Sequence, residues 1–311
     1  MKDLLSIADL NSETIHSLLM DAVDLKSRGW SNILEHKILA LTFEKPSLRT
    51  RVSFEVAMKQ LGGSSIYLSP AEIGLGKRES IPDVARVLGR FVNVISARTF
   101  SHETCEVLAQ YAGIPVINAL SDEEHPCQAL ADLMTIYEKK GGLKKLTVSY
   151  VGDGNNVANS LMLACALTGM NFRIANPEGY AIRDKYWRMA QELAADSGTQ
   201  LFQTEEPKVA VKNADVVYTD VWTSMGQESE DEIRRKVFAA YQVNESLMAY
   251  AKKDALIMHP LPAHHGLEVA VGILDGPQSV VFDQAENRLH AQKAVLVYLL
   301  GGGEVPLARC R

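Results

Sequence analysis

Apolar positions follow two alternating patterns along the first half of the chain. Short runs of apolar, largely β-branched residues lie at 37–43, 64–69, 93–97 and 115–119. Runs of this length between polar segments predict buried strands. After the first run, positions 54, 57, 58 and 61 have the spacing of one helical face, which predicts a helix over 53–61. Similar helical patterns separate the remaining runs, at 81–90, 102–112 and 127–139.

A second series of the same kind follows Lys139-Lys140-Gly141-Gly142, the best candidate for a linker. Its apolar runs lie at 146–152, 171–176, 215–221 and 255–259, and an amphipathic helical pattern covers about 286–300. Alternating strands and helices predict parallel sheets covered by helices on both faces. We therefore predict an α/β protein with two doubly wound parallel-sheet domains, 1–142 and 143–311, and a ligand site in the cleft between them.

Composition narrows the function classes. The chain has 311 residues, of which 47% are hydrophobic and 23% charged, and a net charge of −6. It has no basic segment, which argues against a nucleic-acid partner. It also has no run of 18 apolar residues, no signal-peptide pattern and no CxxC pair among its four cysteines. These features predict a soluble cytoplasmic protein without a membrane span, a zinc knuckle or a disulfide framework.

The segment FEKPSLRTR at 43–51 has the pattern of an anion site. It follows a predicted strand, and Ser47 suits the cap of the next helix, whose first backbone N–H groups attract anions. Thr50 adds a hydroxyl and Arg49 a charged fork. Arg51 lies about 200° around the helix from Arg49, so it is expected to pair with Glu55 instead. A plain helix cap with surface arginines is the alternative.

Two further motifs carry polar side chains that can bind a ligand. In HPCQ at 125–128, His125 and Gln128 lie one helical turn apart and can grip one small polar group, although a capping His and a surface Gln have the same pattern. In DVWTSMG at 220–226, Asp220 can bind an ammonium group and Gly226 allows a loop to fold over a ligand. An exposed surface turn is the alternative for this second motif.

The turn VGDGNN at 151–156 does not fit a dinucleotide site. The fingerprint needs a glycine where Val157 stands, and the next strand ends without an acidic residue for a ribose. Asn155 and Asn156 can present an amide to a ligand or simply cap the helix. In HPLP at 259–262 the prolines leave carbonyl groups available, and we expect a cis peptide before Pro262.

Together with GLGKRESIPDVARVLGR at 74–90 and AENRLHAQKAVL at 285–296, these motifs resemble the aspartate/ornithine transcarbamoylase family over almost the whole chain. The D-x-x-x-S-M-G pattern is that of the ornithine branch. The resemblance implies transfer of the carbamoyl group from carbamoyl phosphate to the δ-amine of L-ornithine, giving L-citrulline and phosphate. It implies no metal and no organic cofactor. It also implies a homotrimer or a multiple of trimers, with the last helix, about 285–311, packed back on the first domain.

The resemblance also implies the roles of individual residues. Carbamoyl phosphate would be bound by Ser47, Leu48, Arg49, Thr50, Arg98, His125, Pro126, Cys127, Gln128, Pro260, the Leu261 carbonyl and Arg288. Ornithine would be bound by Asn156, Asp220, Ser224 and Met225. The residues expected to carry the chemistry are Arg49, Arg98, His125, Gln128, Asp220 and Pro260. The resemblance gives Lys77 and Arg78 as further candidates to reach the anion, from the same or a neighbouring subunit, and an ordinary surface loop is the alternative.

The chain departs from the family pattern at two positions. Gly74 stands where many relatives have Gln, and Pro260 stands where ornithine enzymes usually have Cys. HPLP is typical of the aspartate branch. Two alternatives therefore stay open. The chain is a carbamoyltransferase for another acceptor (aspartate, putrescine or an N-acylornithine), or it is a catalytically idle homologue that binds metabolites.

Overall fold

The computed structural model describes residues 3–76, 78–224, 226 and 228–301. The chain forms two compact units, and each is described by itself. Unit 1 comprises Met1–Met134 and Glu286–Arg311, and unit 2 comprises Thr135–Ala285. Lys77 and Met225, two residues of the predicted sites, lie outside the described residues.

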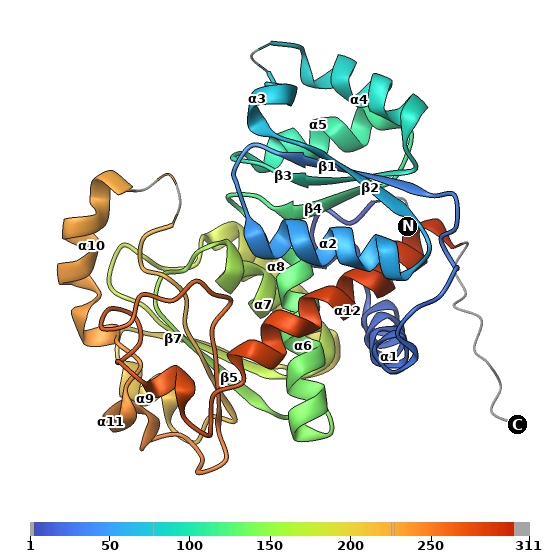
Figure 1. Ribbon diagram of the computed structural model, residues 1–311. Coiled ribbons are helices and arrows are strands. Elements are labelled where there is room, and N and C mark those ends of the chain that lie inside the picture. The colour runs from blue at the N-terminus through green and yellow to red at the C-terminus, as the bar shows by residue number, and fades with distance from the viewer. Residues whose placement is uncertain (1–2, 77, 225, 227, 302–311) are drawn as a thin grey trace, which may run out of the picture. The chain divides into compact units, whose positions relative to one another are not determined.

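Unit 1 contains a parallel sheet of four strands in the order β2-β1-β3-β4 (Figure 1). Its strands are β1 (Ile38–Phe43), β2 (Ser64–Leu68), β3 (Val94–Arg98) and β4 (Val116–Leu120). The inner strand β3 is buried along its whole length, whereas the edge strand β2 has only exposed and half-buried positions. Continuous apolar runs therefore became the inner strands, as expected for a sheet covered on both faces.

Helices cover both faces of this sheet. Helices α4 and α5 pack together on one face, and α2 lies on the other (Figure 1). Gly89 in α4 permits this packing, because a Cβ atom there would lie 1.9 Å from the Ala112 carbonyl oxygen of α5. The helices with residues in unit 1 are α1 (Ser12–Arg28), α2 (Leu48–Gln60), α3 (Pro70–Ile73), α4 (Ile81–Phe91), α5 (His102–Ala112), α6 (Pro126–Lys140) and α12 (Val281–Leu300).

The last helix, α12, packs against the helices of unit 1, as predicted. Its buried Lys293 donates hydrogen bonds from Nζ to the carbonyl oxygens of Leu25 (2.9 Å) and Gly29 (2.8 Å) at the end of α1. A third bond, of 3.2 Å, joins Lys293 Nζ to Oε1 of Gln60 in α2. A buried ammonium needs such partners, so these bonds fix where α12 lies on α1 and α2.

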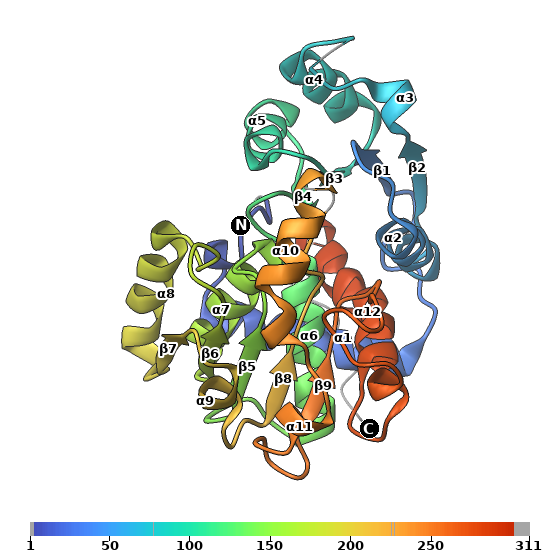
Figure 2. The same cartoon turned by 90° about the vertical axis from the view of Figure 1, so that its left-hand side faces the viewer.

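Unit 2 contains a parallel sheet of five strands in the order β7-β6-β5-β8-β9, which Figure 2 shows side by side. They are β5 (Thr147–Val151), β6 (Asn171–Ala175), β7 (Leu201–Thr204), β8 (Val216–Tyr218) and β9 (Leu256–Met258). Helices α7 and α8 pack together on one face, and α9 contacts β5 and β6 from the other. The helices of this unit are α7 (Asn156–Thr168), α8 (Asp184–Ser197), α9 (Pro207–Val211), α10 (Asp231–Val237) and α11 (Glu245–Met248).

All eight strands predicted from the sequence are present, and the α/β fold class is confirmed. The ninth described strand, β7, has a short sequence, LFQT, with half-exposed and exposed positions, so it lacks the apolar run that marks the others. Several boundaries differ from the prediction, for example at three elements. Helix α2 begins at Leu48, β8 ends before Asp220, and α6 continues through Lys140 into the expected linker. Among the described helices, none combines the length and the apolar character needed to cross a membrane.

Candidate active site

In each sheet the strand order reverses at one point, and side chains predicted to bind the substrates lie at both points. In unit 1 the chain leaves β1 toward β2 on one side and leaves β3 toward β4 on the other. The loops that follow β1 and β3 therefore diverge and leave room for a ligand at the carboxyl ends of the strands. Phe43 and Arg98, the last residues of these two strands, are partners in the register. Arg98 consequently lies beside the loop that leads to Ser47 and α2.

The start of α2 has the predicted geometry. Ser47 is the N-cap, with an extended backbone, and its Oγ accepts a hydrogen bond from the Thr50 amide at 3.3 Å. Leu48 is 76% exposed, so only its backbone is suited to a polar ligand. Arg51 donates to Glu55 at 2.9 Å and stacks on Tyr67, as expected for a residue that turns away from the anion.

Three arginines come together at this end of the sheet. Burial, together with the positive charges of Arg288 and Arg49, lowers the pKa of Arg98 to about 10. Arg288, which is 3% exposed, donates to the Thr50 hydroxyl at 3.2 Å and to Gln128 Oε1 at 2.8 Å. Like charges repel one another, and an anion bound among them would attract each arginine and so offset that repulsion.

The loop before α6 adds a neutral imidazole. Burial holds the pKa of His125 well below its ordinary value of 6.5, and Arg288 and Arg98 act in the same direction. His125 is therefore neutral at pH 7 and can donate one hydrogen bond without adding charge. Pro126 is the first residue of α6, so His125 lies directly before the helix.

Gln128 is held from both ends of its amide. Its Nε2 donates to Asp132 Oδ1 at 2.8 Å, and its Oε1 accepts from Arg288. Sequence reasoning missed Asp132, although it lies one turn after Gln128 on the same helix. Cys127 is also buried, and burial raises the pKa of its thiol to about 12. It is therefore a poor proton acceptor at neutral pH. We call Ser47, Arg49, Thr50, Arg98, His125, Gln128 and Arg288 the arginine site.

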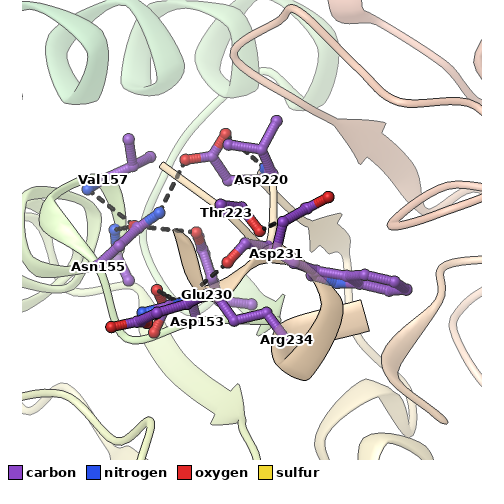
Figure 3. A network of polar contacts seen from close by, with 12 residues as sticks. Asp153, Asn155, Val157, Asp220, Thr223, Glu230, Asp231 and Arg234 are labelled. Carbon is purple, nitrogen blue, oxygen red and sulfur yellow. Dashed lines mark hydrogen bonds and ion pairs between the residues drawn. The ribbon is translucent and has the colours of Figure 1, made fainter. Parts of the chain in front are cut away.

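In unit 2 the strand order reverses between β5 and β8. Asn155, after β5, is the N-cap of α7, and its Oδ1 accepts from the amides of Val157 (3.0 Å) and Ala158 (3.1 Å). Its Nδ2 donates to Asp220 Oδ2 at 2.9 Å (Figure 3). Asn155 is thus the structural cap. Asn156, the predicted ligand, is the first helical residue and is partly exposed.

Asp220 is a buried carboxylate two residues after the end of β8. Burial raises its pKa above the ordinary value of 3.8, although His259 and the hydrogen bond from Asn155 oppose that shift. Its Oδ1 also accepts from the Val221 amide at 2.8 Å. A cationic ligand beside Asp220 would favour the ionised carboxylate. Ser224 lies four residues further on and is partly buried.

The HPLP segment after β9 is fixed by a buried pair that sequence reasoning did not single out. His259 Nδ1 accepts from the Leu261 amide at 2.9 Å, which leaves Nε2 to donate to Glu268 Oε1 at 3.2 Å. The Leu261–Pro262 peptide is cis, as predicted, and Leu261 has a φ of 56°. Pro260 is buried and offers neither an N–H nor a titratable group. We call Asn155, Asp220, His259 and Glu268 the carboxylate site.

The structure therefore divides the predicted site residues between the two units. The described residues from Ser47 to Gln128, together with Arg288, belong to unit 1, whereas Asn156, Asp220, Ser224, Pro260 and Leu261 belong to unit 2. Among the described residues, no cluster of three or more His, Cys, Asp and Glu side chains is arranged to hold a metal ion.

Comparison with known proteins decides the family. Residues 2–138 match the model of the carbamoyl-P binding domain of aspartate/ornithine carbamoyltransferases, and residues 144–299 match the model of their Asp/Orn binding domain. The chain belongs to the aspartate/ornithine carbamoyltransferase family. The resemblance inferred from the motifs is thereby confirmed. The residues of the arginine site from Ser47 to Gln128 lie within the match to the carbamoyl-P binding domain, whereas Arg288 and the whole carboxylate site lie within the match to the Asp/Orn binding domain.

Individual relatives are similar over nearly their full length. The chain is 53% identical to an ornithine carbamoyltransferase of Anoxybacillus flavithermus over 303 residues, 96% of each chain. It is 54% identical to that of Pyrococcus abyssi over 307 residues, 97% of this chain and 96% of the relative. The solved ornithine carbamoyltransferase of Pyrococcus furiosus superposes with a TM-score of 0.94 at 52% identity, over 97% of this chain and 98% of the other.

Proposed function

We propose that the protein transfers the carbamoyl group of carbamoyl phosphate to the δ-amine of L-ornithine, forming L-citrulline and phosphate. The observation that carries this proposal is the arginine site, where the charges of Arg98 and Arg288 act on a neutral His125 and Arg288 also donates to Thr50 in the first turn of α2. The relatives named ornithine carbamoyltransferase support the choice of acceptor, as does the D-x-x-x-S-M-G segment.

The arginine site suits both ends of carbamoyl phosphate. In this proposal the phosphate lies at the first turn of α2, where the backbone N–H groups, Arg49 and Arg98 neutralise its charge. The carbamoyl oxygen lies near His125 and Arg288. Donors at that position stabilise the negative charge that develops on the oxygen in the tetrahedral intermediate. Gln128 and Asp132 hold Arg288 in place for this role.

The carboxylate site suits the acceptor amino acid. Asp220 would bind the α-ammonium group, while Asn156, Ser224 and Met225 would orient the rest of ornithine. The δ-amine attacks as the neutral base, so its ammonium form first loses a proton to solvent. The new C–N bond forms, the C–O bond to phosphate breaks, and the departing phosphate takes the second proton of the amine. Positioning and charge stabilisation supply most of the rate acceleration.

A second acceptor has one observation in its favour. Pro260 gives the HPLP sequence typical of the aspartate branch, and it removes the thiol that ornithine enzymes usually have there. Aspartate is therefore the second candidate. Product formation should be measured from carbamoyl phosphate with ornithine, aspartate, putrescine and N-acetylornithine in parallel. We expect citrulline from ornithine alone. Turnover of another acceptor, or of none, would reject the proposal.

We also propose that the protein assembles as a homotrimer or a multiple of trimers. Unit 1 exposes apolar side chains at Leu48 and Val52 on one face of α2 and at Ile66 on the edge strand β2. Light scattering after size-exclusion chromatography measures the mass directly, and a 34.2 kDa monomer at micromolar concentration would contradict this proposal.

A further inference from the structure

A buried ion pair in unit 2 belongs to neither site described above. Arg234 in α10 contacts Asp153, in the turn after β5, with 2.8 Å between Nη1 and Oδ2 (Figure 3). Their side chains are only 7% and 11% exposed. The second N–H of the same Nη1 donates to the Trp222 carbonyl oxygen at 2.9 Å, and Nε donates to Glu230 at 2.9 Å. We call Asp153, Trp222, Glu230 and Arg234 the Arg234 latch.

The latch joins two segments that carry the proposed ornithine ligands. Asp153 lies three residues before Asn156, and Trp222 lies between Asp220 and Ser224. A second contact closes the same loop, because the Thr223 hydroxyl donates to Asp231 at the start of α10 at 3.0 Å. Helix α10 therefore holds residues 222 and 223 directly, one through a carbonyl group and the other through a side chain.

The turn that carries Asp153 is itself anchored. The Gly154 amide donates to the Tyr180 carbonyl oxygen at 2.9 Å, and a Cβ atom on Gly154 would lie 2.4 Å from the Ile182 amide nitrogen. The Tyr180 ring stacks under the Arg234 guanidinium, with 4.9 Å between the ring centroid and Cζ. Arg234 thus connects the loop after β8 to a turn that has little room to move.

Stability alone does not explain this arrangement. Apolar side chains of similar size often stabilise a fold as well as a buried ion pair does, because charges lose much solvation on burial. The guanidinium instead contributes geometry, because its N–H donors lie in one plane and hold several oxygen atoms in fixed positions at once. Here those oxygens belong to the β5–α7 turn, to the backbone before Ser224 and to Glu230, the residue that precedes α10.

We propose that Arg234 and Asp153 are positioning residues for the acceptor amino acid, which they serve by holding the 222–224 segment at a fixed distance from Asn156 and Asp220. The inference rests on the proposed function. It predicts an effect on one substrate only, because all residues of the latch lie in unit 2 and none belongs to the arginine site. Loss of the latch should therefore weaken ornithine use and leave carbamoyl phosphate binding alone.

The test compares Arg234→Met, Asp153→Asn and Arg234→Lys with the wild-type protein. Arg188→Met is the matched control, because its guanidinium is also in unit 2 but is 75% exposed, 3.7 Å from Asp184. We expect Arg234→Met to raise the KM for ornithine by about tenfold or more, as misplacement of a binding loop does, with the KM for carbamoyl phosphate changed less than about twofold. Lysine should recover part of this loss, Asp153→Asn should have a smaller effect, and the control should have none.

Amide hydrogen exchange over residues 221–224 supplies a readout that needs no turnover. Exchange there should be faster in Arg234→Met than in the wild type and unchanged in Arg188→Met. Unchanged exchange and an unchanged KM for ornithine would overturn the inference. Equal losses for both substrates, without recovery by lysine, would leave only a structural role and overturn it as well.

Failure of the proposed function has a different signature. If the wild-type protein carbamoylates another amine, the function is wrong, and the same KM comparison with that amine tests the latch. If it carbamoylates none, ornithine binding by calorimetry replaces the KM. Carbamoyl phosphate binding by each variant shows that its unit 1 is folded, and Asp153→Asn keeps the test decisive should Arg234→Met fail to fold.

Discussion

The two sheets place opposite charges at equivalent positions. In unit 1 the strand next to the reversal ends in Arg98, among the charges of Arg49 and Arg288, whereas in unit 2 the corresponding strand leads into Asp220. Burial disfavours the charged form in both, so it lowers the pKa of Arg98 and raises that of Asp220. The same α/β plan thus yields one site suited to an anion and another suited to a cation. Specificity for the ligand depends on the side chains at the strand ends, not on the sheet.

The largest expected effect comes from removing a charge of the arginine site. Arg49→Ala should lower kcat/KM for carbamoyl phosphate by about 10³-fold, because in the proposed mechanism Arg49 donates charged hydrogen bonds to the phosphate that leaves. The KM for ornithine should change far less. Steady-state kinetics with each substrate varied in turn separates the two values, and circular dichroism checks the fold. Near-normal activity would show that the anion is bound elsewhere.

The second largest effect is expected when the negative charge of Asp220 in unit 2 is removed. Asp220→Asn should raise the KM for ornithine by about 10²-fold, because the α-ammonium loses its ionic partner. Stability should stay equal or increase, since the Asp220 carboxylate is buried with a raised pKa and its charge opposes folding at pH 7. Denaturant titration measures the free energy of unfolding. A protein that loses stability and affinity for both substrates would show that Asp220 has a structural role only.

The sequence predicts the contacts within single helices and strands at both sites, but few of the contacts between residues that are far apart in the chain. The Ser47 cap, the pair between Arg51 and Glu55 and the strand ends follow from spacing along one helix or one strand. The contact between Arg288 and Thr50 joins residues 238 positions apart, so no local pattern contains it. Arg288 was found only through family resemblance.

Asp132 and Glu268 were missed for a related reason. In the sequence neither differs from other acidic residues. The role of each, which is to orient Gln128 or His259, depends on its neighbours in the folded protein. Strand β7 was missed because an edge strand needs no continuous apolar run. Sequence patterns therefore identify groups that act directly, whereas the groups that hold them in place depend on the folded neighbourhood.

The pH dependence of stability tests the protonation state of a third buried residue, His125. Its pKa in the folded protein lies well below 6.5, so the unfolded chain binds a proton there that the folded chain does not. Stability from this residue is complete above pH 6.5 and falls as the pH drops below it, by about 1.4 kcal/mol per pH unit. His125→Gln removes the titration, so its free energy of unfolding should fall less between pH 7 and pH 5.5 than that of the wild type. Parallel curves for the two proteins would contradict the assignment of a neutral buried imidazole.

The smallest expected effect concerns Arg51, which tests whether position or mere charge defines the arginine site. Arg51 lies two residues from Arg49 on α2, but it pairs with Glu55 and stacks on Tyr67, and its side chain is 46% exposed. An exposed pair of this kind contributes only about 0.2–1 kcal/mol to stability. Arg51→Met should therefore lower the free energy of unfolding slightly and leave both KM values within about twofold of the wild type. If Arg51→Met lost activity on the scale of Arg49→Ala, the helix would present both arginines to the anion, and the distinction between them drawn from helical geometry would be wrong.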